Sequence, residues 1–220
     1  MRRPTWELGA ALAVVASALL ADLVEGNAAA TVPGMVTGKV DRGNVLVYLE
    51  GVPGGAVDAP AAHARITQKE LAFSPDVSVV LKGTTVDFPN EDKVFHNVFS
   101  LSTPARFDLG LYKSGDSKSV QFNRAGVVDI YCNIHPQMAA KVRVLDTRYY
   151  AISAGDGSFA IPNVPPGTYP VVAWQPWGDA ARGTVTVEPG RPASVALSMP
   201  PAQSKGAHVR KDGTPYGRYQ

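Results

Sequence analysis

Apolar and polar residues alternate with a period of two along most of the chain from residue 34 onward. Val45, Val47 and Leu49 show this alternation, and residues 77–81 and 84–88 repeat it. Side chains of a β-strand point alternately to its two faces, so this period predicts strands. Further strands are predicted at residues 35–40, 65–69, 94–100, 118–123, 127–132 and 140–145, with clusters of Gly, Pro, Asn and Asp between them. Many short strands spaced in this way predict a β-sandwich.

A second group of strands is predicted after a boundary placed near Asp146. These strands cover residues 149–153, 158–162, 169–175, 184–188 and 194–198, with turns at 155–157 and 165–167. The pattern thus predicts an all-β protein with one sandwich over residues 31–145 and a smaller one over 146–199. Residues 51–62 are predicted to be a surface loop, and residues 200–220, which lack periodicity, a flexible tail.

The composition agrees with a folded, loop-rich protein. The chain has 220 residues, of which 21 are Gly and 18 are Pro, 45% are hydrophobic and only 18% are charged. This composition excludes disorder as the main state, and its content of Gly and Pro argues against long helices. The formal net charge is +2 and the charges are scattered. Nucleic acid is therefore not an expected partner.

The first thirty residues have the pattern of a secretory signal peptide. Arg2 and Arg3 precede an apolar run at residues 8–20, and small residues follow up to Ala30. Cleavage is expected near Ala30, although a cut after Ala21 or an uncleaved membrane anchor remain alternatives. We therefore expect a periplasmic or secreted protein with no membrane contact unless this segment is retained. Export places the single cysteine, Cys132, in an oxidising compartment, where a liganded or buried thiol is safe.

The chemistry of the chain concentrates around that cysteine. Cys132, His135 and Met138 lie within seven residues at the end of a predicted strand, where a tight loop brings their side chains together. A second histidine, His96, lies on an earlier predicted strand. Two imidazoles, one thiolate and one thioether form the ligand set that suits copper in electron transfer.

Other interpretations of these residues are possible. Each residue alone is more often part of a core than a metal ligand. His63 and His208 are the other histidines, but neither lies on an apolar strand that could hold it at a fixed distance from Cys132. A structural zinc site would need more Cys or His ligands and would not use Met138. Copper is therefore the expected metal.

These residues resemble those of the cupredoxins, the type 1 blue copper family, and in particular its amicyanin-like and plastocyanin-like members. The resemblance covers about residues 32–145 and rests on Cys132-x-x-His135-Pro136-x-Met138 and on His96-Asn97-Val98. It implies a Greek-key β-sandwich with one type 1 copper per chain. Phe95, where relatives have proline, and Asn133-Ile134 in the loop depart from the family pattern.

The resemblance also implies a role for each matching residue. His96 and His135 bind copper through Nδ1, Cys132 is the thiolate, and Met138 is the long axial ligand. Asn97 donates a backbone hydrogen bond to the thiolate, and its side chain ties the two ligand loops together. His135 is the partly exposed ligand through which electrons enter and leave.

The second group of strands resembles the carboxypeptidase regulatory-like, or transthyretin-like, β-sandwich. The resemblance covers about residues 146–199 and rests on the run from Gly157 to Tyr169 with its Pro-Pro-Gly turn. It implies that Phe159 and Tyr169 point inward. It names a fold rather than an activity, so a structural or docking role is expected.

The leading functional hypothesis is an exported carrier of single electrons that is not an enzyme. The family resemblance suggests a c-type cytochrome or a quinoprotein dehydrogenase as its redox partner. The alternative is a periplasmic protein that binds, delivers or senses copper, with the second sandwich as a docking module. A copper oxidase or nitrite reductase would need a further histidine-rich centre, which this chain can hardly build. A structural protein with a decayed site is a further alternative.

Overall fold

The computed structural model describes residues 32–206 and 208–216, and it is all-β there, as the sequence predicts. The expected signal peptide at residues 1–30 lies outside the described residues. No helix in the described part is long and apolar enough to cross a membrane. The strands are β1 (Gly34–Val40), β2 (Leu46–Leu49), β3 (Ala64–Arg65), β4 (Thr67–Lys69), β5 (Ala72–Ser74), β6 (Val77–Leu81), β7 (Thr85–Pro89), β8 (His96–Ser100), β9 (Phe107–Tyr112), β10 (Ser117–Gln121), β11 (Gly126–Tyr131), β12 (Ala139–Leu145), β13 (Tyr150–Ile152), β14 (Ser158–Val164), β15 (Gly167–Trp174), β16 (Ala181–Val187) and β17 (Pro192–Leu197).

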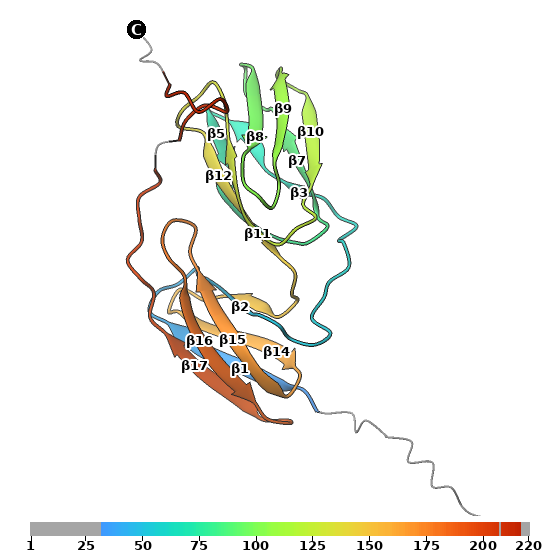
Figure 1. Ribbon diagram of the computed structural model, residues 1–220, viewed down its shortest axis with the longest axis vertical. Coiled ribbons are helices and arrows are strands. Elements are labelled where there is room, and N and C mark those ends of the chain that lie inside the picture. Colours follow the sequence, from blue (N-terminus) through green and yellow to red (C-terminus); the bar gives the residue numbers. More distant parts are fainter. Residues whose placement is uncertain (1–31, 207, 217–220) are drawn as a thin grey trace, which may run out of the picture. The chain divides into compact units, whose positions relative to one another are not determined.

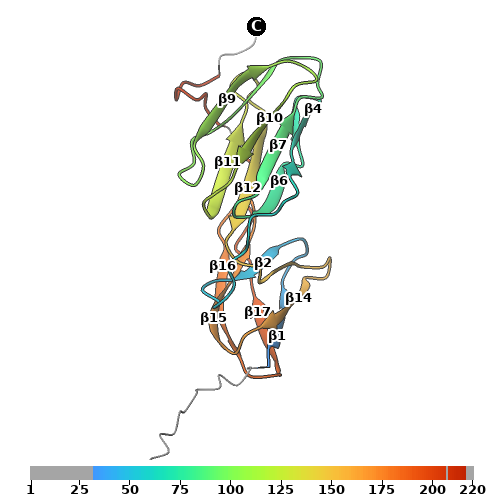
Figure 2. The same cartoon turned by 90° about the vertical axis from the view of Figure 1, so that its right-hand side faces the viewer.

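The strands form two sandwiches (Figures 1 and 2). We call the first the central sandwich: it combines the sheet β6-β12-β11-β8-β9 with the sheet β10-β7-β3. Its core contains Phe88, Phe122 and Ile130, which are fully buried. We call the second the flanking sandwich: it combines the sheet β14-β1-β17 with the sheet β13-β2-β15-β16. Each sandwich therefore buries its own apolar face.

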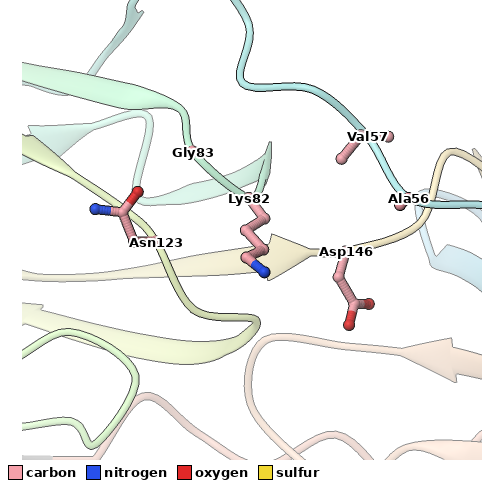
Figure 3. A pocket seen from close by; sticks show the side chains of 6 residues that line it. All are labelled: Ala56, Val57, Lys82, Gly83, Asn123 and Asp146. Atoms are coloured by element: carbon pink, nitrogen blue, oxygen red, sulfur yellow. The ribbon is translucent and has the colours of Figure 1, made fainter.

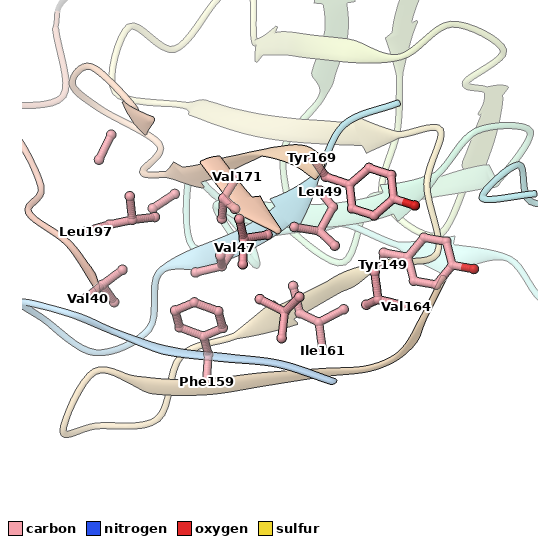
Figure 4. Close-up of a cluster of buried hydrophobic side chains, with 14 of the residues drawn as sticks. Val40, Val47, Leu49, Tyr149, Phe159, Ile161, Val164, Tyr169, Val171 and Leu197 are labelled. Carbon is pink, nitrogen blue, oxygen red and sulfur yellow. The ribbon is translucent and has the colours of Figure 1, made fainter. Parts of the chain in front are cut away.

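The core of the flanking sandwich follows from the alternation in its strands. Along β14 the buried residues are Phe159, Ile161 and Val164, while their neighbours are exposed. Figure 4 shows these side chains facing Val47, Leu49 and Val171 from the opposite sheet. Tyr169 is buried in the same cluster. The inward orientation predicted for Phe159 and Tyr169 is thus confirmed, as expected for two aligned sheets with alternating faces.

The predicted domain boundaries do not match the strand pairing. Residues 31–145 were expected to form one sandwich, but β1 pairs with β14 and β17, and β2 pairs with β13 and β15. The flanking sandwich therefore combines residues 34–49 with residues 150–197, and the central sandwich is inserted between β2 and β13. Alternation identifies a strand but does not say which distant strand it pairs with.

Strand β2 packs against apolar side chains on both of its faces. Val47 and Leu49 point into the core of the flanking sandwich, and Leu46 and Tyr48 join a separate cluster with Leu145. All four residues of β2 are buried. The strand is thus covered on both faces, which a period of two could not have revealed.

The structure also contains strands that the alternation did not predict. β9, which carries Asp108, pairs with β8 with a register shift between Asn97 and Phe99. Gly110 within β9 has a φ of 66°, a conformation that glycine adopts readily. An interrupted strand of this kind lacks the regular period that identifies strands in a sequence.

The placement of β2 leads to a stability prediction. Leu49→Ala should lower the free energy of unfolding by about 2–5 kcal/mol, because Leu49 is fully buried in the core of the flanking sandwich. Urea denaturation measures this loss. Leu111→Ala is the control, since Leu111 is 58% exposed on β9 and its truncation should change stability by less than about 0.5 kcal/mol. Equal stabilities of the two variants would contradict the assignment of β2 to this core.

Candidate metal centre

The predicted ligands lie at the ends of strands in the five-stranded sheet of the central sandwich. His96 begins β8, Cys132 follows β11 directly, and His135 and Met138 lie in the loop between β11 and β12. We call residues 132–138 the ligand loop. Tyr131 of β11 pairs with Phe99 of β8, so the sheet brings the start of the ligand loop beside the strand of His96.

Backbone hydrogen bonds close the ligand loop tightly. The Cys132 N–H donates to the Met138 carbonyl over 3.2 Å, and the Met138 N–H donates to the His135 carbonyl over 3.1 Å. Tyr131 and Ala139, on either side of the loop, pair across β11 and β12. The short loop therefore turns back on itself and directs its side chains toward β8.

Three potential ligand atoms converge at this place. His96 Nδ1 lies 3.0 Å from His135 Nδ1, and Cys132 Sγ lies 4.0 Å and 3.7 Å from these two nitrogens. A metal ion about 2.0–2.1 Å from each nitrogen and about 2.3 Å from the sulfur fits among atoms spaced in this way. His96 and Cys132 are fully buried, and His135 is half-buried. One thiolate and two imidazoles suit a copper or zinc ion chemically.

The surroundings of Cys132 and His135 favour the protonation states that metal binding requires. Burial raises the pKa of the Cys132 thiol, but hydrogen bonds from His96 and from backbone N–H groups, including that of Asn97, outweigh it and lower the pKa. Burial and the positive charge of His96 both lower the pKa of His135. A thiolate and a neutral imidazole are the forms that bind metals, so both shifts prepare the site.

Asp92 holds His96 from the side opposite the other ligands. Its Oδ2 lies 3.1 Å from His96 Nε2 and also accepts the Leu71 N–H over 2.8 Å. A carboxylate at Nε2 favours the proton on that nitrogen and leaves the lone pair of Nδ1 free for a metal. Burial lowers the pKa of His96, but hydrogen bonds to Cys132 and Asp92 outweigh it and raise the pKa.

Met138 lies in the same loop but is less well defined as a ligand. Its side chain is fully buried and belongs to the same apolar cluster as Cys132. Its placement in the closed loop agrees with the predicted axial role. That role stays a prediction.

The role predicted for Asn97 holds for its backbone but not for its side chain. The backbone N–H forms the hydrogen bond that lowers the pKa of the Cys132 thiol. The side chain donates to Asp108 Oδ1 of β9 over 2.7 Å, and its own oxygen is buried without a hydrogen-bond partner. The expected tie from this side chain to the ligand loop is therefore replaced by a tie between β8 and β9. The reason is the register of β9, which was not predicted.

The two other histidines occupy different environments. His63 is exposed, and its Nδ1 lies 3.0 Å from Asp87 Oδ1. His208 stacks on Tyr131, with 4.3 Å between ring centroids and 26° between ring planes. Neither belongs to the cluster of His96, Cys132 and His135. His208 is nevertheless held beside the residue that precedes Cys132.

Residues 200–220 were predicted to be a flexible tail, but described residues within this range contact the ligand loop. The Lys211 N–H donates to Asn133 Oδ1 over 2.9 Å, and the Tyr216 hydroxyl donates to the Cys132 carbonyl over 2.5 Å. Single side chains make these contacts. The alternation of apolar and polar residues could not reveal these contacts, and it could not reveal the contact between Asp92 and His96.

A surface pocket elsewhere in the chain has different chemistry. Figure 3 shows its lining, which includes one lysine and one aspartate but no histidine, cysteine or methionine: Ala56, Val57, Lys82, Gly83, Asn123 and Asp146. The soft donors that suit copper are absent from this lining. The ligand loop therefore remains the candidate metal centre.

Comparison with known sequences found similarity to two kinds of protein. The chain is 29% identical to amicyanin-alpha from Methylorubrum extorquens over 90 residues, which are 40% of this chain and 76% of that protein. A family model described as polysaccharide lyase family 4, domain II, matches residues 126–195. This match includes strands of both sandwiches. The predicted resemblance of residues 146–199 to the carboxypeptidase regulatory-like fold is thus not confirmed.

Comparison with solved structures found cupredoxins and a copper enzyme. A purple cupredoxin from Nitrosopumilus maritimus is 28% identical, covering 37% of this chain and 99% of its own, with a TM-score of 0.34. A copper-containing nitrite reductase from Thermus scotoductus is 24% identical, covering 43% of this chain and 26% of its own, with a TM-score of 0.37. Both TM-scores are low. The sequence similarity to amicyanin-alpha supports a cupredoxin-like fold.

The contact between Asp92 and His96 leads to a binding prediction. Asp92→Asn should weaken Cu(II) binding about 10–100-fold, because the carboxylate that orients His96 is lost. Competition with a chelator of known affinity measures the change. Asp87→Asn is the matched control, since Asp87 holds the exposed His63 in a similar contact outside the cluster. Equal affinities of the two variants would show that Asp92 does not support the site.

Proposed function

We propose that this protein is an exported mononuclear type 1 copper protein that carries single electrons and is not an enzyme. The observation that carries this proposal is the convergence of His96, Cys132 and His135 on one point, with the thiol pKa lowered. Copper bound there would supply one-electron chemistry between Cu(II) and Cu(I). The similarity to amicyanin-alpha supports copper as the metal.

The protein's own residues would serve this chemistry by staying in place. His96 is fixed by Asp92 and by β8, and Cys132 is fixed at the end of β11 by the closed ligand loop. The fully buried side chain of Met138 lies in that loop, where we propose that it is the axial ligand. Ligands held by strands rearrange little when the charge of the metal changes, which favours rapid electron exchange.

His135 is the proposed point of electron entry and exit. It is the one member of the cluster that is only half-buried, whereas His96 and Cys132 are closed to solvent. A redox protein that contacts the surface at His135 would come closest to the metal. We propose a c-type cytochrome or a quinoprotein dehydrogenase as this partner, in the periplasm, on the basis of the cupredoxin resemblance.

Copper delivery is the less favoured alternative. Rapid release of copper requires ligands that an acceptor protein can reach, and two members of the cluster are fully buried. Transfer of copper to an acceptor chelator within seconds, without electron exchange, would favour delivery over electron transfer.

The first test is the visible and EPR spectrum of the protein with one equivalent of Cu(II). We expect an intense thiolate-to-copper charge-transfer band and a narrow type 1 hyperfine splitting, because Cys132 supplies a thiolate. Cys132→Ser should lose both signals, and His63→Ala, the control outside the cluster, should keep them. Ordinary type 2 signals from the unaltered protein would contradict the proposal.

A further inference from the structure

The segment that follows the flanking sandwich returns to the ligand loop. We call residues 208–216 the C-terminal strap (within the dark red part of the chain in Figure 1). It forms no strand, yet its Tyr216 hydroxyl donates to the Cys132 carbonyl over 2.5 Å. Its Lys211 N–H donates over 2.9 Å to the side chain of Asn133, which lies between Cys132 and His135. Two hydrogen bonds thus reach the ligand loop itself.

The strap has an internal structure that prepares these contacts. The Arg210 N–H donates to the Thr214 carbonyl, and the Gly213 N–H donates back to the Arg210 carbonyl, both over 2.9 Å. Asp212 accepts hydrogen bonds from the N–H and the hydroxyl of Thr214, as an Asx turn does. This closed turn brings Tyr216 back toward the start of the strap. It is therefore a defined element.

Aromatic contacts hold the strap against β11. His208 stacks on Tyr131, and the ring of Tyr216 meets His208 edge-on, with 5.1 Å between centroids. The guanidinium group of Arg210 lies over the ring of Tyr216, 5.4 Å from its centroid. Stacked and edge-on rings are favourable beyond their buried area. These contacts place the Tyr216 hydroxyl where it reaches the Cys132 carbonyl.

A second connection reaches β8, the strand that carries His96. Lys211 Nζ forms an ion pair with Asp108 Oδ2 over 2.5 Å, and Asp108 Oδ1 accepts the Asn97 side chain. The Asn97 backbone N–H in turn hydrogen-bonds the Cys132 sulfur. The strap therefore contacts the ligand loop directly and contacts β8 through Asp108 and Asn97.

We propose that the C-terminal strap is a positioning element of the metal centre and that Tyr216 is its main positioning residue. This inference rests on the proposed copper function. The Cys132 N–H is bonded within the ligand loop, while the Cys132 carbonyl accepts the Tyr216 hydroxyl. Tyr216 thus limits the movement of the cysteine backbone and keeps water from its carbonyl. Contacts outside the ligand set orient ligands and tune the metal in this way.

The direction of the effect on the metal follows from charge. A copper–thiolate unit is formally more positive in the Cu(II) state, so water near it stabilises the oxidised form more. Loss of the hydroxyl donor also leaves more electron density on the cysteine. Both effects lower the reduction potential when the strap is removed.

The experiment compares the unaltered protein, Tyr216→Phe and a truncation after Gly206. Tyr216→Phe keeps the ring and removes the hydroxyl donor. At a fixed ambient potential we expect the Cu(II)/Cu(I) ratio to rise about threefold to tenfold, as the loss of a single hydrogen bond permits. A tenfold rise corresponds to a fall of about 59 mV in the reduction potential. Truncation should raise the Cu(II)/Cu(I) ratio at least as far and should broaden the EPR hyperfine lines. Tyr150→Phe, an exposed tyrosine of β13, is the control and should leave both unchanged.

A metal-free measurement separates this inference from the proposed function. Backbone amides of residues 133–138 should exchange with deuterium several times faster after truncation, because the loop loses its hydrogen bonds with Lys211 and Tyr216 of the strap. Unchanged exchange, or an unchanged potential and EPR spectrum in the truncated protein, would overturn the strap proposal alone. Absence of a type 1 spectrum in the unaltered protein would instead overturn the copper function.

Discussion

The metal centre depends on the closure of the short loop between β11 and β12. The hydrogen bond from the Cys132 N–H to the Met138 carbonyl reverses the chain directly after β11 and directs Cys132 and His135 toward β8. The pairing of Tyr131 with Phe99 sets the distance to His96. A sandwich core of fully buried side chains keeps these strands from shifting. Without this closure His135 would not be held beside His96 and Cys132.

The electrostatics of the site follow from the same arrangement. Removing a thiol and two imidazoles from water opposes their charged forms, yet nearby hydrogen bonds lower the pKa of Cys132. His135 is kept neutral by burial and by the neighbouring His96. Asp92 fixes the opposite ring edge of His96. The protein thus favours a thiolate at Cys132 and a neutral imidazole at His135 before any metal binds, whereas hydrogen bonds to Cys132 and Asp92 raise the pKa of His96.

The chain path gives the flanking sandwich a structural connection to the site. Residues 34–49 and 150–197 enclose the central sandwich in sequence, and the C-terminal strap returns from β17 to the ligand loop. Non-local contacts of this kind join the ends of the chain to its middle. The central sandwich therefore depends on segments outside its own sequence range for some contacts around Cys132.

The sequence by itself determined the all-β class, most of the strands and the identity of the converging residues. Alternation reports which face of a strand is buried, and the spacing of Cys132 and His135 reports a loop, so both are local properties. Only the tertiary structure decided that β1 and β2 belong to the flanking sandwich, that Asn97 binds Asp108, and that Asp92 and Tyr216 contact the site. These features depend on register and on single contacts between distant segments. Periodicity carries no information about either, because a strand looks the same whichever partner it pairs with.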